Sequence, residues 1–396
     1  MIKIVSNKSN RQDKYPIQDY GVKVAQEVCA YHQSYPEYSM TPLVKLDALA
    51  NELGVSKLLL KDESKRFGLN AFKVLGGSYC IGKYIAKQLN LSADKFNFAT
   101  LVSDEVKGQL GELTFVTATD GNHGRGVAWT ANRLGHKSVV FMPKGTVPER
   151  LENIRKLGSD ASITDMIYDD CVRKAKACAD EFGWVVTQDT AWEGYEEIPK
   201  WIMQGYTTIA YEILQQLEGD KPTHVFLQAG VGSMAGAIAA FFADYYGEDC
   251  PVITIVEPNG ADCIYRTAET NDGKLHFVTE DLHSIMAGLC CGEPCTIAWE
   301  IMESYAKHFV SMPDWVAAKG MRVLGNPLGE DERVVSGESG ASCFGLVVEA
   351  LQNPEFAWLK EQLGLNGESK ILCISTEGDT DKENYRSIVW DGAYHK

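Results

Sequence analysis

A lysine between an aromatic residue and a glycine pair is the feature of this sequence best suited to covalent chemistry. Phe72 precedes Lys73, and Gly76 and Gly77 follow at the expected start of a helix. Apolar surroundings disfavour the charged form of a lysine and lower its pKa, so that a neutral amine becomes accessible. A neutral amine condenses with an aldehyde, most often that of pyridoxal phosphate. Taken alone, however, a lysine near a helix start is more often a solvated surface residue.

The segment 230–236 has the composition of a phosphate-binding turn. It follows an apolar stretch, 223–229, and precedes a helical pattern of small residues at 237–246. Glycines let backbone N–H groups approach an anion closely, and the N-terminus of a helix adds partial positive charge. The residues of this turn are Gly230, Val231, Gly232, Ser233, Met234, Ala235 and Gly236. There are two alternatives. The turn could belong to a dinucleotide site with Glu257 as its acidic residue, or it could be a structural turn without a ligand.

A polar loop at 117–126 follows an expected strand, where open α/β sheets bind their ligands. Asn122 offers an amide donor there, and Asp120 is a candidate proton-transfer group. An Asp-Gly turn between strand and helix is the common structural alternative. His123 is expected in the first turn of the next helix, without a catalytic role.

A second polar loop contains Asp189, between an apolar strand and two aromatic residues. Partial desolvation by Trp192 and Tyr195 would raise the pKa of Asp189 toward that of a useful base. The alternative, which the sequence alone favours, is that Asp189 caps the next segment. After the last expected strand, Ser375 and Thr376 present two hydroxyl groups.

Strands and helices alternate through most of the chain, which predicts parallel sheets covered by helices on both faces. One helix should begin at Pro148 and end before Gly158. Asp169 should cap another, which ends before Gly183. Apolar or β-branched runs predict strands at 56–61, 114–119, 138–142, 161–164, 184–188, 223–228, 252–257 and 371–375.

Length and charge narrow the class of protein. The 396 residues are enough for two packed domains. The 38 Lys and Arg residues against 54 Asp and Glu give a formal net charge of -16, which disfavours nucleic acid and anionic membranes as partners. No segment has the length of a membrane span or the apolar run of a signal peptide. We therefore expect a soluble, cytoplasmic protein.

The eleven cysteines are scattered, and several lie in apolar segments, which indicates reduced, buried thiols. No pair of cysteine clusters has the spacing of a zinc site, so no metal is expected. The sequence leaves open one disulfide, from Cys263 to Cys290 or Cys291.

The order of these segments resembles the fold-type II, tryptophan-synthase-like family of pyridoxal-phosphate enzymes. Lys73 comes first, then Asn122, the turn at 230–236, and Ser375 or Thr376. Within that family the sequence resembles the diaminopropionate ammonia-lyases. It covers nearly the whole chain from about Pro36, and the runs that carry it are 61–73, 120–129, 188–195, 286–289, 336–341 and 375–380.

The resemblance implies two three-layer α/β domains with mostly parallel sheets and the cofactor in the cleft between them. Residues 1–77 and 190–396 would form the large cofactor-binding domain. Residues 78–189 would form a smaller, inserted domain that closes on the substrate. A homodimer is also expected on this basis.

The resemblance further assigns roles to individual residues. Lys73, next to Phe72, would hold pyridoxal 5'-phosphate as a Schiff base, and the turn at 230–236 would bind the phosphate. Asn122 would hydrogen-bond the phenolic oxygen of the ring. Thr376, with Ser375 as the alternative, would meet the pyridine nitrogen, and Glu338 would also contribute to the cofactor site.

The reaction implied is the α,β-elimination of the small amino acid 2,3-diaminopropionate to pyruvate and two molecules of ammonia. Asp120 and Asp189 would take the α-proton from opposite enantiomers, with Lys73 as a rival base. Threonine or serine dehydration on the same fold is the alternative reaction. A catalytically silent binding protein and a nicotinamide oxidoreductase are the alternatives from other classes; the first would be expected to lack Lys73, and the second leaves Lys73 unexplained.

Overall fold

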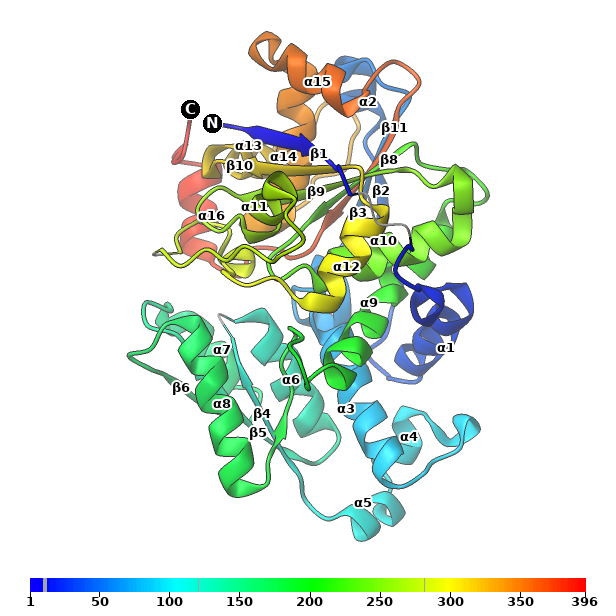
Figure 1. Ribbon diagram of the computed structural model, residues 1–396, viewed down its shortest axis with the longest axis vertical. Coiled ribbons are helices and arrows are strands. Elements are labelled where there is room, and N and C mark those ends of the chain that lie inside the picture. Colours follow the sequence, from blue (N-terminus) through cyan, green and yellow to red (C-terminus); the bar gives the residue numbers. More distant parts are fainter. Residues whose placement is uncertain (10–12, 120, 281) are drawn as a thin grey trace.

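Two β-sheets organise the chain in the computed structural model, which describes residues 1–9, 13–119, 121–280 and 282–396. The larger sheet has seven strands in the order β1-β10-β9-β8-β11-β3-β2, and the smaller has four in the order β6-β5-β4-β7 (Figure 1). The strands are β1 Lys3–Ser6, β2 Leu43–Lys45, β3 Lys57–Asp62, β4 Thr114–Ala118, β5 Lys137–Met142, β6 Asp160–Ile163, β7 Val185–Val186, β8 His224–Gln228, β9 Val252–Pro258, β10 His308–Met312 and β11 Lys370–Ser375.

The α-helices lie between these strands. They are α1 Val22–Gln33, α2 Asp47–Leu53, α3 Val74–Gln88, α4 Phe98–Leu101, α5 Asp104–Leu110, α6 Asn122–Arg133, α7 Pro148–Arg155, α8 Tyr168–Phe182, α9 Glu197–Gln216, α10 Ser233–Tyr246, α11 Cys263–Thr270, α12 Thr296–Tyr305, α13 Asp314–Gly325, α14 Glu338–Gln352, α15 Ala357–Leu363 and α16 Lys382–Val389. Of the short 3-10 helices, η1 Gln18–Tyr20 packs on α9 and α10, and η2 Glu63–Gly68 follows β3.

Both faces of the seven-stranded sheet are buried. Along β3, Leu59 belongs to one apolar cluster and its neighbours Leu58 and Leu60 to the other, because successive side chains of a strand point to opposite faces. The first cluster includes residues of α3, α9 and α10, and the second includes residues of α13 and α14. The sheet is therefore the middle layer of three.

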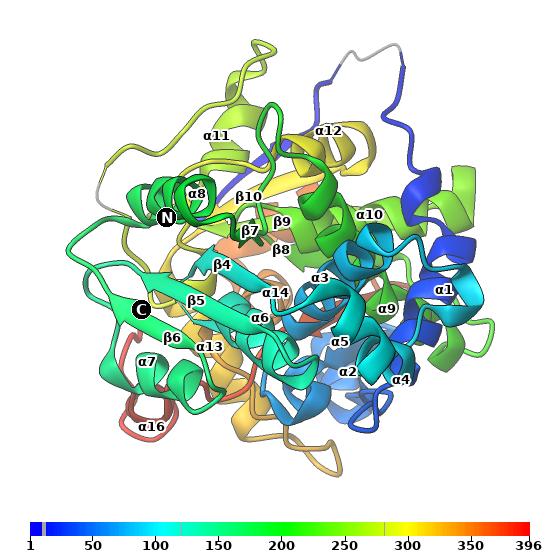
Figure 2. The ribbon, with the colours of Figure 1, turned by 90° about the horizontal axis from the view of Figure 1, so that it is seen from below.

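The four-stranded sheet is parallel throughout and is also covered on both faces. Val116 and Ala118 of β4 pack against α8, whereas Val140 and Met142 of β5 pack with residues of α6 and α7 (Figure 2). The chain thus contains two three-layer α/β units, as the family resemblance implies. All four strands lie within the range 78–189. The limits of that range stay a prediction, because α3 runs without a break through residues 77 and 78.

The pairing of β3 with β11 brings distant parts of the sequence together. The two strands are parallel, with Asp62 opposite Ser375. Beyond them, the Phe72 N–H donates to the Thr376 carbonyl at 3.1 Å, and Ala71 bridges to Glu377. The segment that precedes Lys73 is therefore fixed to the segment that follows the last strand.

Every predicted strand is present, but several other sequence predictions need correction. The helix expected at 237–246 begins at Ser233, so the second half of the glycine-rich turn is the first turn of α10. The helix α8 begins at Tyr168, so Asp169 lies inside it instead of capping it; Gly183 ends it with a φ of +71°. The strands β1, β2 and β10 are not among the strands predicted from apolar runs. Cys263 is a free thiol, which excludes its pairing with Cys290 or Cys291.

No helix in the described part of the chain is long and apolar enough to cross a membrane. The same residues contain no group of three or more His, Cys, Asp or Glu side chains placed to hold a metal ion.

Candidate active site

A pocket between the two sheets collects most of the residues that the sequence singles out. The predicted residues that line it are Phe72, Lys73, Asn122, Asp189, Gly230, Val231, Gly232, Ser233, Met234 and Thr376. They come from the ends of β4, β7, β8 and β11 and from the start of α3. Asp120, the candidate proton-transfer residue, lies outside the described residues.

Lys73 forms an ion pair with Asp189 in this pocket. The Lys73 Nζ donates to Asp189 Oδ2 at 2.9 Å, and the side chains are 17% and 5% exposed. His123 Nδ1 lies 3.7 Å from the same oxygen, and the His123 Nε2 bonds the Thr187 carbonyl at 2.7 Å. His123 is in the first turn of α6, as predicted, but it also lines the pocket.

The neighbours of Asp189 decide its charge. Burial raises the pKa of Asp189, but the charges of His123 and Lys73 and the hydrogen bond from Lys73 outweigh burial and hold that pKa at about 2. The carboxylate is therefore ionised at neutral pH, and the raised pKa that the sequence predicts for Asp189 is wrong. The capping interpretation of Asp189 is wrong, because α9 begins only at Glu197 and the Asp189 side chain points to Lys73.

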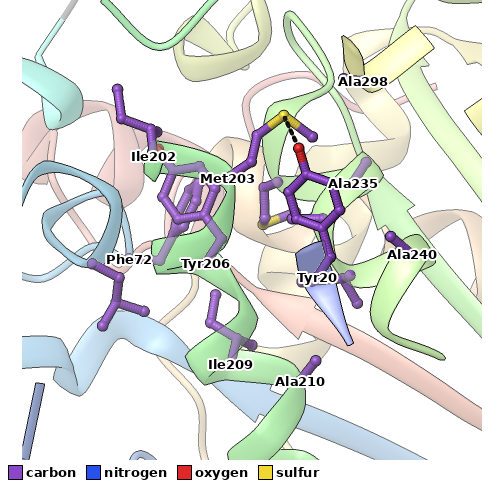
Figure 3. Close-up of a cluster of buried hydrophobic side chains, with 14 of the residues drawn as sticks. Tyr20, Phe72, Ile202, Met203, Tyr206, Ile209, Ala210, Ala235, Ala240 and Ala298 are labelled. Carbon is purple, nitrogen blue, oxygen red and sulfur yellow. Dashed lines mark hydrogen bonds between the residues drawn. The ribbon is translucent and has the colours of Figure 1, made fainter. Parts of the chain in front are cut away.

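The residue before Lys73 packs into the apolar core. The ring of Phe72 packs against that of Tyr206 in α9, with 4.9 Å between the ring centres. Both belong to a buried cluster with residues of α9, α10 and η1, in which the Tyr20 hydroxyl contacts Met203 Sδ at 3.9 Å (Figure 3). The residue before Lys73 is thus packed into the buried core.

The glycine-rich turn leads directly into α10. Gly232 has a φ of +96°, a conformation that disfavours other residues, and a Cβ there would lie 2.6 Å from Met302 Cε. A Cβ on Gly230 would approach Cys291 Sγ to 3.1 Å. Gly236 packs on Ala298 instead, and neither it nor Ala235 lines the pocket. The pocket therefore receives the N-terminus of a 14-residue helix, which favours an anion.

Asn122 and Thr376 each contact a polar residue that the sequence analysis did not select. The Asn122 Nδ2 donates to Glu377 Oε2 at 2.5 Å. The Gln228 Nε2 donates to Thr376 Oγ1 at 3.1 Å and to the Ile374 carbonyl at 2.8 Å. Since the Thr376 oxygen accepts from Gln228, its own O–H is left to donate toward the pocket.

Ser375 and Glu338 lie outside this pocket. The Ser375 Oγ is fully buried and donates to Ser336 Oγ at 2.7 Å. Glu338 lines an adjoining cavity instead, where it accepts a hydrogen bond from Asn384. Burial and the charge of Glu377 raise the pKa of Glu338 to about 7.

Two further hydroxyl groups line the pocket. The Tyr206 Oη and the Ser339 Oγ are buried, and neither has a hydrogen-bond partner among the described residues. Buried polar groups are normally paired, so these two indicate a polar ligand. Tyr206 gives no signal in the sequence, because it lies within an apolar helix. Gln228 does give a signal in the sequence, because it is a polar residue at the end of an apolar strand.

These residues fit pyridoxal phosphate. The pocket offers an amine for its aldehyde, a helix N-terminus for its phosphate, and the donors Asn122 and Thr376 for its ring. The two unpaired hydroxyls of Tyr206 and Ser339 add donors that a phosphate or a ring oxygen can use.

Comparison with known proteins identifies the family. A family model described as pyridoxal-phosphate dependent enzyme matches residues 35–376. A diaminopropionate ammonia-lyase of Salmonella typhimurium is 50% identical over 373 residues, which are 93% of this chain and 92% of that protein. Two crystal structures of the Escherichia coli diaminopropionate ammonia-lyase are each 47% identical and cover 100% of this chain and 98% of theirs. One, in complex with an aminoacrylate-PLP azomethine reaction intermediate, superposes with a TM-score of 0.91, and the other, in complex with D-serine, with 0.93. The chain therefore belongs to the pyridoxal-phosphate-dependent enzymes, in the family of the diaminopropionate ammonia-lyases.

Proposed function

We propose that this protein catalyses the pyridoxal-phosphate-dependent α,β-elimination of 2,3-diaminopropionate to pyruvate and two molecules of ammonia. The observation that carries the proposal is the Lys73–Asp189 pair, at 2.9 Å, in a pocket that also receives the N-terminus of α10. The 50% identity to a diaminopropionate ammonia-lyase over almost the whole chain supports the choice of substrate.

The proposed cofactor contacts follow the chemistry of each group. The Lys73 amine would form the Schiff base, and the backbone N–H groups at the start of α10 would bind the phosphate. Asn122 would donate to the phenolic oxygen, and Thr376 to the pyridine nitrogen. When bound, pyridoxal phosphate supplies the electron sink that makes the α-proton of an amino acid acidic.

Lys73 and Asp189 would move the protons. In the ion pair, the charge of Lys73 helps to keep the pKa of Asp189 low, which makes Asp189 a weak base. Once the lysine nitrogen is held in a covalent bond, Asp189 keeps the charge of His123 but loses that of Lys73, so its pKa rises from this low value. Because the two groups lie within hydrogen-bond distance, a proton taken by one can pass to the other. The pair can serve as base for the α-proton and as acid for the departing amine.

A substrate that carries a second ammonium group suits the carboxylates around this pocket. Asp189 and Glu377 both line it, and attraction between opposite charges favours a diamino acid over a hydroxy-amino acid. Threonine or serine dehydration is the competing reaction on the same scaffold.

The proposal also includes the action of Asp120 and Asp189 on opposite enantiomers. Alanine at each of these positions should impair the reaction of a different enantiomer. Equal loss with both enantiomers would contradict it.

The proposal includes a cytoplasmic homodimer. The described residues contain no disulfide, which suits a reducing compartment. The dimer rests on the resemblance to the family, and the mass of the protein in solution tests it.

The test is an absorbance scan of the purified protein before and after addition of D,L-2,3-diaminopropionate, with pyruvate measured by a coupled enzyme. We expect a visible Schiff-base band that changes on addition, together with pyruvate. Lys73→Ala should abolish both, whereas Lys65→Ala, at an exposed lysine of the same segment, should change neither. Pyruvate or a related keto acid from L-serine or L-threonine, but none from diaminopropionate, would favour the dehydratase. Absence of the band after reconstitution would exclude the enzyme function.

A further inference from the structure

Glu377 joins the two halves of the pocket through one carboxylate. Its Oε2 accepts from the Asn122 Nδ2 at 2.5 Å and from the Thr380 Oγ1 at 3.4 Å, and its Oε1 accepts from the Ser339 backbone N–H at 3.1 Å. Asn122 begins α6, which covers the four-stranded sheet, whereas Ser339 lies in the first turn of α14, which covers the seven-stranded sheet. Glu377 is 4% exposed and lines the pocket.

The backbone holds this carboxylate in place. Glu377 bridges to Ala71, two residues before Lys73, and its carbonyl accepts from the Gly337 N–H at 2.9 Å. A Cβ on Gly340 would come within 2.9 Å of that carbonyl oxygen, so α14 packs directly on this segment. Glu377 is therefore fixed relative to Lys73, and it does not depend on Asn122 for its position.

The contact decides which way the Asn122 amide faces. A carboxylate oxygen accepts hydrogen bonds, so the amide atom that meets Glu377 must be the nitrogen. That nitrogen carries two hydrogens. One hydrogen is donated to Glu377. The other remains available for a second hydrogen bond, and Asn122 lines the pocket.

We propose that Glu377 is a positioning residue that orients the Asn122 amide so that its second N–H donates to an oxygen of the bound cofactor. The inference rests on the proposed function, since it takes Asn122 as a cofactor ligand. Nothing in the sequence pattern or in the family resemblance assigned a role to Glu377.

Glu377→Gln tests this role with almost no change of shape. Glutamine has a single acceptor oxygen, and the Ser339 N–H and the Asn122 amide would compete for it, whereas the Thr380 hydroxyl can also accept from the glutamine NH2. If the Ser339 N–H keeps the glutamine oxygen, the glutamine NH2 faces Asn122. The Asn122 amide must then turn so that its Oδ1 accepts from this NH2, and Oδ1 takes the place of the N–H that faced the cofactor. We expect pyridoxal phosphate to leave the holoenzyme about tenfold faster, the factor that corresponds to about 1.4 kcal/mol. The measurement is loss of the visible band after dilution into a reagent that traps released cofactor.

A double-mutant cycle separates positioning from general structural support. Asn122→Ala alone should also speed release, and Glu377→Gln should add nothing in that background. Asp379→Asn is the matched control, because Asp379 accepts from the Asn70 amide at 3.1 Å on the same segment without contacting Asn122. It should leave the release rate unchanged.

Three results would overturn the inference: an unchanged release rate in Glu377→Gln, effects of the two substitutions that multiply, or an equal effect of Asp379→Asn. A wild-type protein that never shows the band would instead refute the proposed function itself. The two failures are therefore distinguishable.

Discussion

At the scale of single residues, the Lys73–Asp189 pair is the contact on which activity depends most directly. Asp189→Asn keeps the size of the side chain but removes its charge. We expect kcat for at least one enantiomer of diaminopropionate to fall by about 10²- to 10⁴-fold, the usual contribution of a general base, while the visible band remains. Steady-state kinetics on each enantiomer separately would measure this. Full activity of the variant toward both enantiomers would assign the base role to another group.

Glu338 gives a prediction about pH. Because burial and Glu377 raise its pKa to about 7, the folded protein binds this proton more tightly than the unfolded chain does. Stability is then lost as pH rises from the ordinary carboxyl pKa through about 7. Glu338→Gln removes this loss, and its Oε1 can still accept from Asn384. The melting temperature of the variant should therefore exceed that of the wild type more at pH 8 than at pH 5.

The gain at pH 8 is on the order of 3 kcal/mol, from the change in pKa of the buried carboxyl. A difference in melting temperature that does not vary between pH 5 and pH 8 would show that Glu338 keeps an ordinary pKa.

At the scale of elements, the turn into α10 should tolerate no side chain at Gly232. Alanine there must adopt a φ of +96° and must also displace Met302. We expect Gly232→Ala to destabilise the protein by about 1–3 kcal/mol and to weaken cofactor binding. Gly247→Ala, at the other end of the same helix, is the control. Gly247 also has a positive φ, +57°, but a Cβ there would have no atom within 4 Å. Melting curves and cofactor titrations of both variants would separate backbone strain from the steric clash.

A buried network of charges supports the segment before Lys73. Arg66 in η2 pairs with Glu63 at 2.8 Å and with Glu212 of α9 at 2.7 Å, and Lys61 of β3 also pairs with Glu212 at 2.7 Å. All four side chains are fully buried. Burial raises the pKa of Glu212, but Arg66 and Lys61 outweigh it and hold that pKa at about 2.

Arg66→Met would leave two buried carboxylates with too few partners. We expect a loss of about 3–5 kcal/mol in the free energy of unfolding. Lys57→Met, also on β3, breaks an exposed pair with Asp220 and should cost no more than about 1 kcal/mol. Denaturant titration of both variants would test the contrast, and similar losses would refute it.

The elements themselves were largely predictable, because local patterns encode them. Apolar runs such as 371–375 predicted strands, and Gly183 predicted the end of a helix. The strand β10 was missed because His308 and Ser311 interrupt its apolar pattern, although all five of its residues are buried in the sheet. The start of α10 was misplaced because Gly236 looks like part of a loop, whereas it lies in the helix to allow close packing on Ala298.

At the scale of the whole molecule, the site depends on contacts that no local pattern reveals. Asn122 and Glu377 are separated by 255 positions, and only the fold brings them together. The resemblance to a known family selected Lys73, Asn122 and Thr376, which line the pocket. It could not show that Ser375 turns away from the pocket, since the direction of a side chain at a strand end depends on the exact end of the strand.

Because the pocket lies between the two sheets, the cofactor should stabilise residues of both. Removal of pyridoxal phosphate with hydroxylamine should speed hydrogen exchange of backbone amides in the first turn of α6 and in 230–236 by about tenfold. The strand β10, which does not line the pocket, should show no change. Exchange measured by mass spectrometry would test this, and equal changes in β10 would indicate loss of global stability instead.

The pairing of β3 with β11 has a consequence for the synthesis of the protein. The ribosome produces Lys73 early, but the segment that fixes its position, around Thr376 and Glu377, emerges only after some three hundred further residues. During most of translation the reactive amine therefore has no pocket. Cofactor loading must wait until the nascent chain carries its last strand, so a messenger truncated before β11 would yield a polypeptide unable to retain pyridoxal phosphate.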